Sequence, residues 1–364
     1  MGRNTLLFNT ASHNTAFGYE AATQNTTGTE NTALGERALH YNTTGPYNTA
    51  CGYQALYSNT TAEKNTACGY QAFYTNTTGY WGAAFGYRAL YSNTTGYYNT
   101  AVGQRALYSN TTGGYNTASG IVALYTNTTG IHNTASGYVA LYYNTTGNYN
   151  TASGSFALYT NSTGHTNVAS GYYALYANTT GSYNTASGNN SLQANTTGTY
   201  NTAFGMYAGQ NITTGSYNSC LGYNAQTSSA TVDDEVVLGD AHIATLRCNT
   251  STISALSDAR DKVEVEPSPL GIDFINTLNP VKFLWQSREG NSKDGTYEIG
   301  FIAQELQAVQ ASSNTEYLKM VIDENPDRLE ASYGQLVPIL VQAIKELSAQ
   351  VKELSTDVNQ LQTP

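Results

Sequence analysis

One pattern of apolar and polar positions recurs along the first two thirds of the chain. The motif Asn-Thr-Ala-x-Gly begins at Asn14 and returns with a constant 17-residue period, without insertion, down to a degenerate copy at Asn218, which gives 13 copies. The full unit is N-T-A-x-G-Y-x-A-L-Y-x-N-T-T-G-x-Y, and only the copy at Gly82, GAAFG, lacks the leading Asn. A fixed period of this length indicates a repeat architecture.

Seventeen residues are too few for two helices and a turn, and the two Gly-containing turns of each unit leave room only for two short strands. We therefore predict an all-β solenoid in which each unit is one coil and equal positions stack about 4.8 Å apart. Because a coil supplies only three or four apolar side chains, we expect several chains to associate.

The columns of equal positions predict which side chains form the interior. Position 8 is Ala in nearly every copy and position 9 is almost always Leu or Phe, so a small column should lie beside an apolar one. Position 4 is Phe, Leu, Cys or Val in the first six copies and Ser in the next five, and we expect it to face inward throughout. Asn at positions 1 and 12, as in Asn48 and Asn59, should form amide ladders between coils.

Two columns have both a structural and a binding interpretation. Position 10 is Tyr in eight consecutive copies from Tyr57 to Tyr176, and the rings could pack between chains or stack on carbohydrate; we favour packing. Asn-Thr-Thr at position 12 is formally a glycosylation sequon. Its regularity from Asn25 to Asn195 instead indicates turn chemistry, which needs Asn, Thr and Gly in this order.

The repeat resembles the shafts of phage tail fibres and the β-roll heads of trimeric autotransporter adhesins. This resemblance covers residues 14 to about 225 and implies a trimeric architecture without identifying a receptor.

Charge divides the chain into two parts. Residues 1–230 contain four acidic and five basic residues, whereas the rest of the chain, 231–364, contains 21 acidic and 10 basic ones. The net charge of −10 and the lack of a basic stripe argue against a nucleic-acid partner. No apolar run in the sequence could span a bilayer, and the first residues lack the apolar region of a secretory signal, so we expect no membrane insertion.

The shaft offers little chemistry for catalysis or metal binding. Its His residues occur at irregular positions and the four Cys residues show no CxxC spacing, so we expect free thiols, no metal and no cofactor. Glycoside hydrolysis uses two carboxylates in one cleft. Glu30 and Glu36 are the only close acidic pair in residues 1–230, so we do not expect a glycosidase.

After Tyr223 the repeat ends, and residues 232–248 have the pattern of strands with a turn at Gly239 and Asp240. Four motifs then follow in order: residues 257–262 (SDARDK), 271–275 (GIDFI), 279–281 (NPV) and 299–305 (IGFIAQE). Together they resemble the auto-processing intramolecular chaperone of endosialidase-type tailspikes and related fibres, over roughly residues 235–364.

That resemblance implies a self-cleaving serine peptidase that acts only on its own chain. In the family, a Ser and a Lys five residues later form the catalytic pair, and the chain is cut just before the Ser. Carried onto this sequence, the nucleophile is Ser257, the base is Lys262, the cut lies between Leu256 and Ser257, and Asp258 and Arg260 are supporting residues. A Lys can act as a base only if burial or a nearby cation lowers its pKa from about 10.4.

A spacing of five residues brings two side chains together on neither a helix nor a strand. We infer that a bend or a neighbouring chain closes the gap, so that the site is complete only in the folded trimer. The competing interpretation is that Ser257 and Asp258 only cap a helix and Lys262 is solvated; the other three motifs argue against it.

The rest of this region predicts a small mixed α/β domain, with a short helix within 269–278, a strand at 281–285 and a strand leading into a helix over 299–309. Apolar residues then alternate spacings of three and four, which predicts a coiled coil over about 336–362: Val337, Leu340, Ile344, Leu347, Val351, Leu354, Val358 and Leu361. Val or Ile at a with Leu at d favours two strands. The solenoid and the chaperone resemblance require three, so we expect a homotrimer.

These observations predict a lead-in at 1–13, a shaft at 14–230, a β junction at 231–256 and a chaperone at 257–364. The function that we infer is a viral tail fibre on the virion, which binds a host-cell receptor such as a carbohydrate and attaches to a tail or baseplate protein through its N-terminus. The alternative is an extracellular adhesin fibre at the surface of a bacterium or injection system, with the same chaperone left uncleaved.

Overall fold

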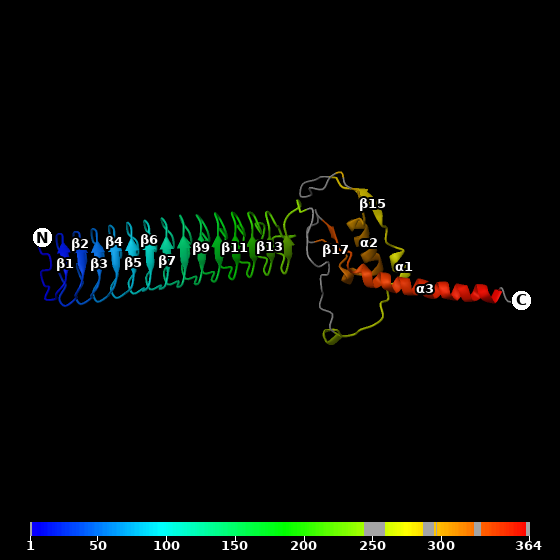
Figure 1. Ribbon diagram of the computed structural model, residues 1–364, viewed down its shortest axis with the longest axis horizontal. Helices are drawn as coiled ribbons and strands as arrows, with labels where there is room; N and C mark the ends of the chain where they lie inside the picture. Colours follow the sequence, from blue (N-terminus) through cyan, green and yellow to red (C-terminus); the bar gives the residue numbers. More distant parts are fainter. Residues whose placement is uncertain (1, 244–258, 287–294, 296, 324–328, 362–364) are drawn as a thin grey trace. The chain divides into compact units, whose positions relative to one another are not determined.

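The computed structural model of the chain describes residues 2–243, 259–286, 295, 297–323 and 329–361. These residues form two compact units, 1–240 and 241–364. The first unit is a β-solenoid of 17-residue coils, and the second is a small α/β region that ends in a long helix, as the sequence predicts (Figure 1).

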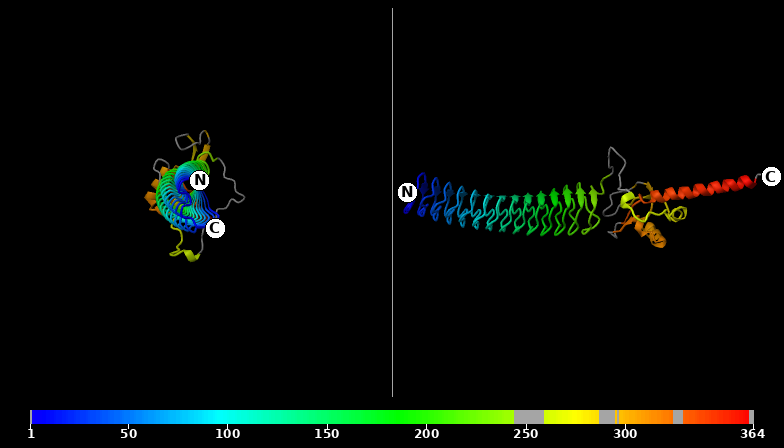
Figure 2. Two further views of the ribbon diagram at one scale, coloured as in Figure 1. Left: turned by 90° about the vertical axis from the view of Figure 1, so that its left-hand side faces the viewer. Right: turned by 90° about the horizontal axis from the view of Figure 1, so that it is seen from below.

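The first unit contains one parallel sheet of 14 strands, in which each strand pairs with the next so that equal repeat positions lie opposite each other. Seen end-on, successive coils lie over one another and rotate gradually (Figure 2). Each strand has three residues: β1 Thr15–Phe17, β2 Thr32–Leu34, β3 Thr49–Cys51, β4 Thr66–Cys68, β5 Ala83–Phe85, β6 Thr100–Val102, β7 Thr117–Ser119, β8 Thr134–Ser136, β9 Thr151–Ser153, β10 Val168–Ser170, β11 Thr185–Ser187, β12 Thr202–Phe204, β13 Ser219–Leu221 and β14 Val236–Leu238.

Each coil has one strand, and the second strand expected from its length is not formed. Positions 7 and 9 have left-handed backbone angles, as in Val122 (φ 51°) and Leu124 (φ 52°), and this interrupts an extended conformation. The segment still bonds to the next coil, since the Leu124 amide donates to the Ala140 carbonyl at 3.0 Å. Turn residues therefore continue the ladder between coils without forming a second sheet.

The stacking continues beyond the 13 repeats at both ends. Strand β14 pairs with β13 in the same register, and the Glu235 amide donates to Asn218 Oδ1 at 3.0 Å. At the other end, the Leu6 amide donates to the Ala21 carbonyl at 3.1 Å. Residues before Asn14 therefore cover the first coil, and residues 231–239 add to the last one.

The interior of the solenoid is a set of narrow columns. Ala at positions 3 and 8, Leu at position 9 and Asn at positions 1 and 12 are buried throughout the central coils. The Asn side chains at position 12 form the predicted amide ladder; for example, Asn127 Nδ2 donates to Asn110 Oδ1 at 2.8 Å. At position 1 part of the column also forms this ladder, as Asn133 Nδ2 donates to Asn116 Oδ1 at 3.2 Å. The same side chains bond the backbone as well, because Asn116 Oδ1 accepts the backbone N–H of Asn133 and Asn116 Nδ2 donates to the carbonyl of Gly130.

The expectation that position 4 faces inward is wrong. Ala at position 3 occupies the interior, and side chains alternate along a strand, so positions 2 and 4 must both point outward. Phe17 is 65% exposed and Phe85 is 43% exposed, whereas Ala84, the middle residue of β5, is fully buried. The outer surface of the sheet therefore carries the changing apolar and Ser residues of position 4.

The irregular copy at Gly82 has a steric cause. Phe73 is the only Phe at position 9, and it is fully buried. A Cβ added to Gly82 would lie 2.4 Å from Cε2 and Cζ of the Phe73 ring. The coil thus lacks Asn at position 1 because the larger ring of the preceding coil occupies that space.

The second unit has the short helix, the two strands, the following helix and the long terminal helix predicted from the sequence, and four short elements that were not predicted, η1, η2, β17 and β18. In chain order, the elements are the 3-10 helix η1 Ala259–Asp261, α1 Ile272–Ile275, β15 Val281–Leu284, β16 Tyr297–Gly300, α2 Ala303–Ser313, η2 Glu316–Leu318, β17 Val321–Ile322, β18 Glu330–Ala331 and α3 Leu336–Leu361. Strands β15 and β16 pair antiparallel, as do β17 and β18. A core of five buried residues joins α1, α2 and the first turn of α3: Phe274, Leu306, Met320, Leu336 and Ile339.

Candidate functional site

The predicted cleavage site is only partly contained in the described residues. Leu256, Ser257 and Asp258 lie outside them, so the distance from the predicted nucleophile to Lys262 is not part of the described structure. Arg260 lies in η1, and the backbone N–H of Lys262 donates to the carbonyl of Ala259 at 3.3 Å, which closes this turn. Both Arg260 and Lys262 are exposed in the single chain.

The segment that follows Lys262 exposes two valines among charged residues. Val263 is 86% exposed and Val265 is 77% exposed, and they alternate with Glu264 and Glu266. Side chains exposed to this extent are available for contact with another chain. A single chain therefore leaves the neighbourhood of the predicted base uncovered, and sequence inspection did not single out these two valines.

Helix α3 has two apolar faces with different partners. Leu336, Ile339 and Ala343 are buried against the core of the second unit. The eight residues that predict a coiled coil are instead exposed by 43–86%: Val337, Leu340, Ile344, Leu347, Val351, Leu354, Val358 and Leu361. An unbroken heptad stripe of this kind is stable when it packs against equivalent helices.

A carboxylate fixes α3 to α1. Glu346 Oε2 accepts the backbone N–H of Ile272 at 2.7 Å, and Gln342 Nε2 donates to Glu346 Oε1 at 2.9 Å. Both bonds lower the pKa of Glu346, and the one from the Ile272 backbone contributes more than the one from Gln342. Ile272 belongs to the GIDFI motif, so this motif holds the base of the helix that carries the heptad stripe.

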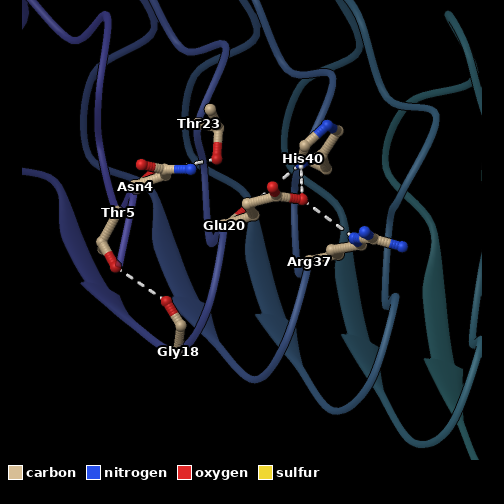
Figure 3. Close-up of polar contacts among 7 residues, drawn as sticks. All are labelled: Asn4, Thr5, Gly18, Glu20, Thr23, Arg37 and His40. Carbon is tan, nitrogen blue, oxygen red and sulfur yellow. Dashed lines mark hydrogen bonds and ion pairs between the residues drawn. The ribbon is translucent and has the colours of Figure 1, made fainter. Parts of the chain in front are cut away.

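The shaft contains one cluster of charged side chains among its first coils. Arg37 Nε donates to Glu20 Oε2 at 2.9 Å, and His40 Nδ1 lies 4.0 Å from the same oxygen (Figure 3). A hydrogen bond from Tyr19, and then the one from Arg37, lower the pKa of Glu20. This carboxylate is engaged by neighbouring coils and is not paired with a second carboxylate, so the cluster ties coils together.

The Tyr column at position 10 stacks within the chain. The rings of Tyr74 and Tyr91 are 5.1 Å apart and nearly parallel, as are those of Tyr108 and Tyr125. Each ring thus covers the face of the next, and a sugar ring cannot reach those faces. Exposed rings at position 17 stack in the same way, as His132 does on Tyr149 at 4.9 Å.

Among the residues that the structure describes, no group of three or more His, Cys, Asp or Glu side chains could hold a metal ion. Within that same part of the chain, no helix is long and apolar enough to cross a membrane.

The comparison with protein families identifies one region. Residues 257–314 match the model of the family described as the chaperone of endosialidase, Peptidase_S74. This is the family of self-cleaving chaperone domains, and the match begins at the residue predicted as the nucleophile. No match was found among curated proteins or solved structures. A solenoid shaft followed by a region that matches this family fits a trimeric fibre with a C-terminal chaperone.

Proposed function

We propose that the chain is one subunit of a homotrimeric fibre, and that residues 257–364 direct its assembly and then separate from it by cleavage between Leu256 and Ser257. The observation that carries the proposal is the combination of a regular solenoid, a region at 257–314 that matches the chaperone family, and a following helix α3 that exposes a heptad stripe. The stripe supports association, and the family match supports the processing step.

A shaft of near-identical coils needs a device that sets the register of its chains. Successive coils present nearly the same surface, since their strands pair in the same register, so two chains shifted by one coil would still meet at nearly equivalent residues. Long-range pairing of this kind is also slow to form. Three α3 helices packed through the heptad stripe would hold the chains at equal height while the coils stack.

The proposed cleavage uses the side chain on the C-terminal side of the bond. The Ser257 hydroxyl attacks the Leu256 carbonyl carbon, and the Lys262 amine takes the hydroxyl proton. The Lys262 ammonium then gives this proton to the Ser257 nitrogen, the C–N bond breaks, the nitrogen leaves as an amine, and the acyl group is held as an ester on Ser257. Water hydrolyses the ester, which releases the Leu256 carboxylate and restores the hydroxyl.

The exposure of Lys262 in the single chain supports a site that is completed by assembly. A lysine becomes a base near neutral pH only where burial or a nearby cation disfavours its charged form. The exposed Val263 and Val265 offer a surface on which a neighbouring chain can cover this segment. Cleavage would then follow trimer formation and report that the fibre is correctly folded.

The setting that we propose is a viral tail fibre, bound to a tail or baseplate protein and to a receptor on the host cell. It rests on the resemblance of the repeats and of the chaperone to such fibres. The resemblance of the same repeats to adhesin heads favours one alternative, an extracellular fibre of a bacterium or injection system.

The test is the intact mass of the purified wild type beside Ser257→Ala, Lys262→Arg and Lys282→Ala. We expect a fragment that begins at Ser257 from the wild type and from Lys282→Ala, which alters another exposed lysine. Ser257→Ala and Lys262→Arg should stay uncut, since the arginine keeps the charge but cannot accept the proton. A wild-type chain that remains whole after it has formed trimers would contradict self-cleavage.

A further inference from the structure

The outer surface of the solenoid sheet, which we call the strand face, consists of the side chains at positions 2 and 4 of every coil. From β1 to β14, among the described residues, it is the one face with exposed Phe and Leu side chains, which lie in β1, β2, β5 and β12–β14. Phe17 is 65% exposed, Phe204 is 48% exposed and Leu238 is 49% exposed. Sheet faces with such residues are normally covered.

Charge separates the strand face from its neighbours. None of its 28 side chains, two in each of the 14 strands from β1 to β14, is charged. The acidic and basic residues of the 13 coils instead occupy positions 6, 7, 16 and 17: Glu20, Glu30, Glu36, Arg37, Glu63, Lys64, Arg88, Arg105, Asp233 and Asp234. Glu235, directly before β14, is at position 1 and also lies off the strand face. Depletion of charge on a continuous surface is the compositional mark of the core of an interface.

The other uncharged surface, at positions 10 to 14, already has its partners within the chain. Its Thr hydroxyls donate to carbonyls of the next coil, as Thr128 Oγ1 does to Thr145 at 3.1 Å. Its Tyr rings stack on one another, as Tyr125 does on Tyr142 at 5.1 Å. It exposes no Phe or Leu side chain between β1 and β14, so apolar burial does not require that this surface be covered.

The strand face is divided into bands along the shaft. Position 4 is apolar or Cys in β1–β6, Ser in β7–β11, and apolar again in β12–β14. In a parallel, in-register assembly with cyclic symmetry, each coil meets its own copies at the same height. Apolar residues then meet apolar residues and Ser meets Ser. A shift of one coil would place Ser119 against Val102 and break the match at each band edge.

We propose that the strand face is the surface through which the solenoids of the homotrimer pack on one another, and that its bands set their register. This inference rests on the proposed trimeric fibre and names the surface that the trimer uses. The occupant is a further copy of the chain, because only a copy has the same length, the same coil spacing and the same order of bands. The surfaces at positions 6, 7, 10, 16 and 17 then form the outside of the shaft.

The chain carries its own probe of this surface. Cys51 and Cys68 are at position 4 of adjacent strands and face each other in the ladder, and Cys68 is exposed in the single chain. Cys220 is fully buried at position 3, inside the coil. A protein with Cys51→Ser, Cys248→Ser and Ser257→Ala therefore stays whole and offers one reactive thiol, on the strand face.

The experiment compares that protein with a matched control. The control also has Cys68→Ser and gains a thiol through Tyr149→Cys, at position 17, where the side chain is 57% exposed. Light scattering first establishes the number of chains. Each trimer is then treated with a bulky maleimide under native and denaturing conditions, and in parallel with a short bifunctional maleimide.

We expect Cys68 to resist the bulky reagent in the native trimer, to react fully once denatured, and to link chains through the short reagent. The thiol from Tyr149→Cys should react under both conditions without linking chains. Native labelling of Cys68 as fast as the control would overturn the assignment of the face while leaving the trimer intact. A single-chain mass for both proteins would instead contradict the proposed fibre as well.

A charge substitution gives an independent readout. Ser136→Lys with Ser153→Lys places like charges at position 4 of two adjacent coils, where three copies would converge. Thr129→Lys with Thr146→Lys adds the same charges at exposed position 14. We expect the first pair alone to lower the thermal midpoint of the full-length trimer. Equal midpoints for the two pairs would overturn the proposal.

Discussion

The contact between Phe73 and Gly82 yields a prediction that the repeat consensus would reverse. A consensus argument says that Gly82→Asn should stabilise the shaft, because it restores the Asn of position 1. The structure predicts destabilisation, because a Cβ at residue 82 would lie 2.4 Å from two carbons of the buried Phe73 ring. Overpacking of a close-packed core costs about 1–3 kcal/mol.

The converse change should also destabilise. Phe73→Leu removes buried ring atoms and leaves a space beside the glycine, at about 1–2 kcal/mol, less than the roughly 3–5 kcal/mol of truncating a buried Phe to Ala. The double variant recovers the consensus pair, with a side chain at residue 82 able to bond the backbone N–H of Asn99. We therefore expect the two changes to couple by about 2 kcal/mol or more in the stabilising direction.

Amide hydrogen exchange of peptides between residues 60 and 100 is the suitable assay, because stability in a solenoid is largely local. Each single change should reduce protection there, and the double variant should regain it. Leu124→Phe is the matched control: it places the same ring at position 9 but opposite the buried Asn133, and should destabilise its own coils. Additive effects of the two changes at residues 73 and 82 would refute the reasoning.

Three further predictions concern the ladder and the anchor of α3. Gly120→Ala should lower the free energy of unfolding by about 1–3 kcal/mol, because the φ of Gly120 is +145° and an added Cβ would meet the Gly137 carbonyl. Gly113→Ala should lower it less in the same thermal denaturation measurement, since Ala62 occupies that repeat position naturally. Asn127→Ala should lower the free energy of unfolding by at least about 2 kcal/mol in thermal denaturation, because it removes the hydrogen bonds to Asn110 and Gly130 and leaves the buried Asn144 Nδ2 without its acceptor. Thr129→Ala, at an exposed position, should be nearly neutral in the same measurement. The lowered pKa of Glu346 means that its bond to Ile272 stabilises the second unit above the usual pKa of 4.5 and is lost as the pH falls through the folded-state value. The second unit of Glu346→Gln should thus be less stable than the wild type at neutral pH, and its stability should no longer fall with acidification through this group. Near-UV circular dichroism over a series of pH values measures both effects.

The 17-residue period was enough to predict the solenoid, because the Ala, Leu and Asn columns recur at fixed spacing and bury at each recurrence. It was harder to predict which columns face the interior and which face outward. Position 4 was placed inside because its Phe, Leu and Val residues are apolar, and a list of letters does not show which side of a three-residue strand faces the interior. The fully buried Ala at position 3 settles the alternation and turns position 4 outward.

The second strand of each coil was predicted from the length of the unit and its two Gly-containing turns, and the left-handed angles at positions 7 and 9 prevent it. Leu and Val do not usually adopt such angles, so the residue types at these positions do not predict that the extended backbone is interrupted there. In the C-terminal unit the main helices and the β15–β16 pair were predicted, whereas the two-residue strands β17 and β18 are too short to show a pattern. The four motifs led to the family that matches residues 257–314. The pairing of Ser257 with Lys262 remains a prediction, because Ser257 lies outside the described residues.

Association of chains is the central claim, and the molar mass of the uncut protein tests it most directly. Ser257→Ala keeps each chain at about its full 39.0 kDa, so a homotrimer has three times 39.0 kDa, about 117 kDa. Sedimentation equilibrium or light scattering of this variant should give that mass at every concentration measured. A mass of one chain, or of two as the heptad residues alone would favour, would contradict the trimeric fibre.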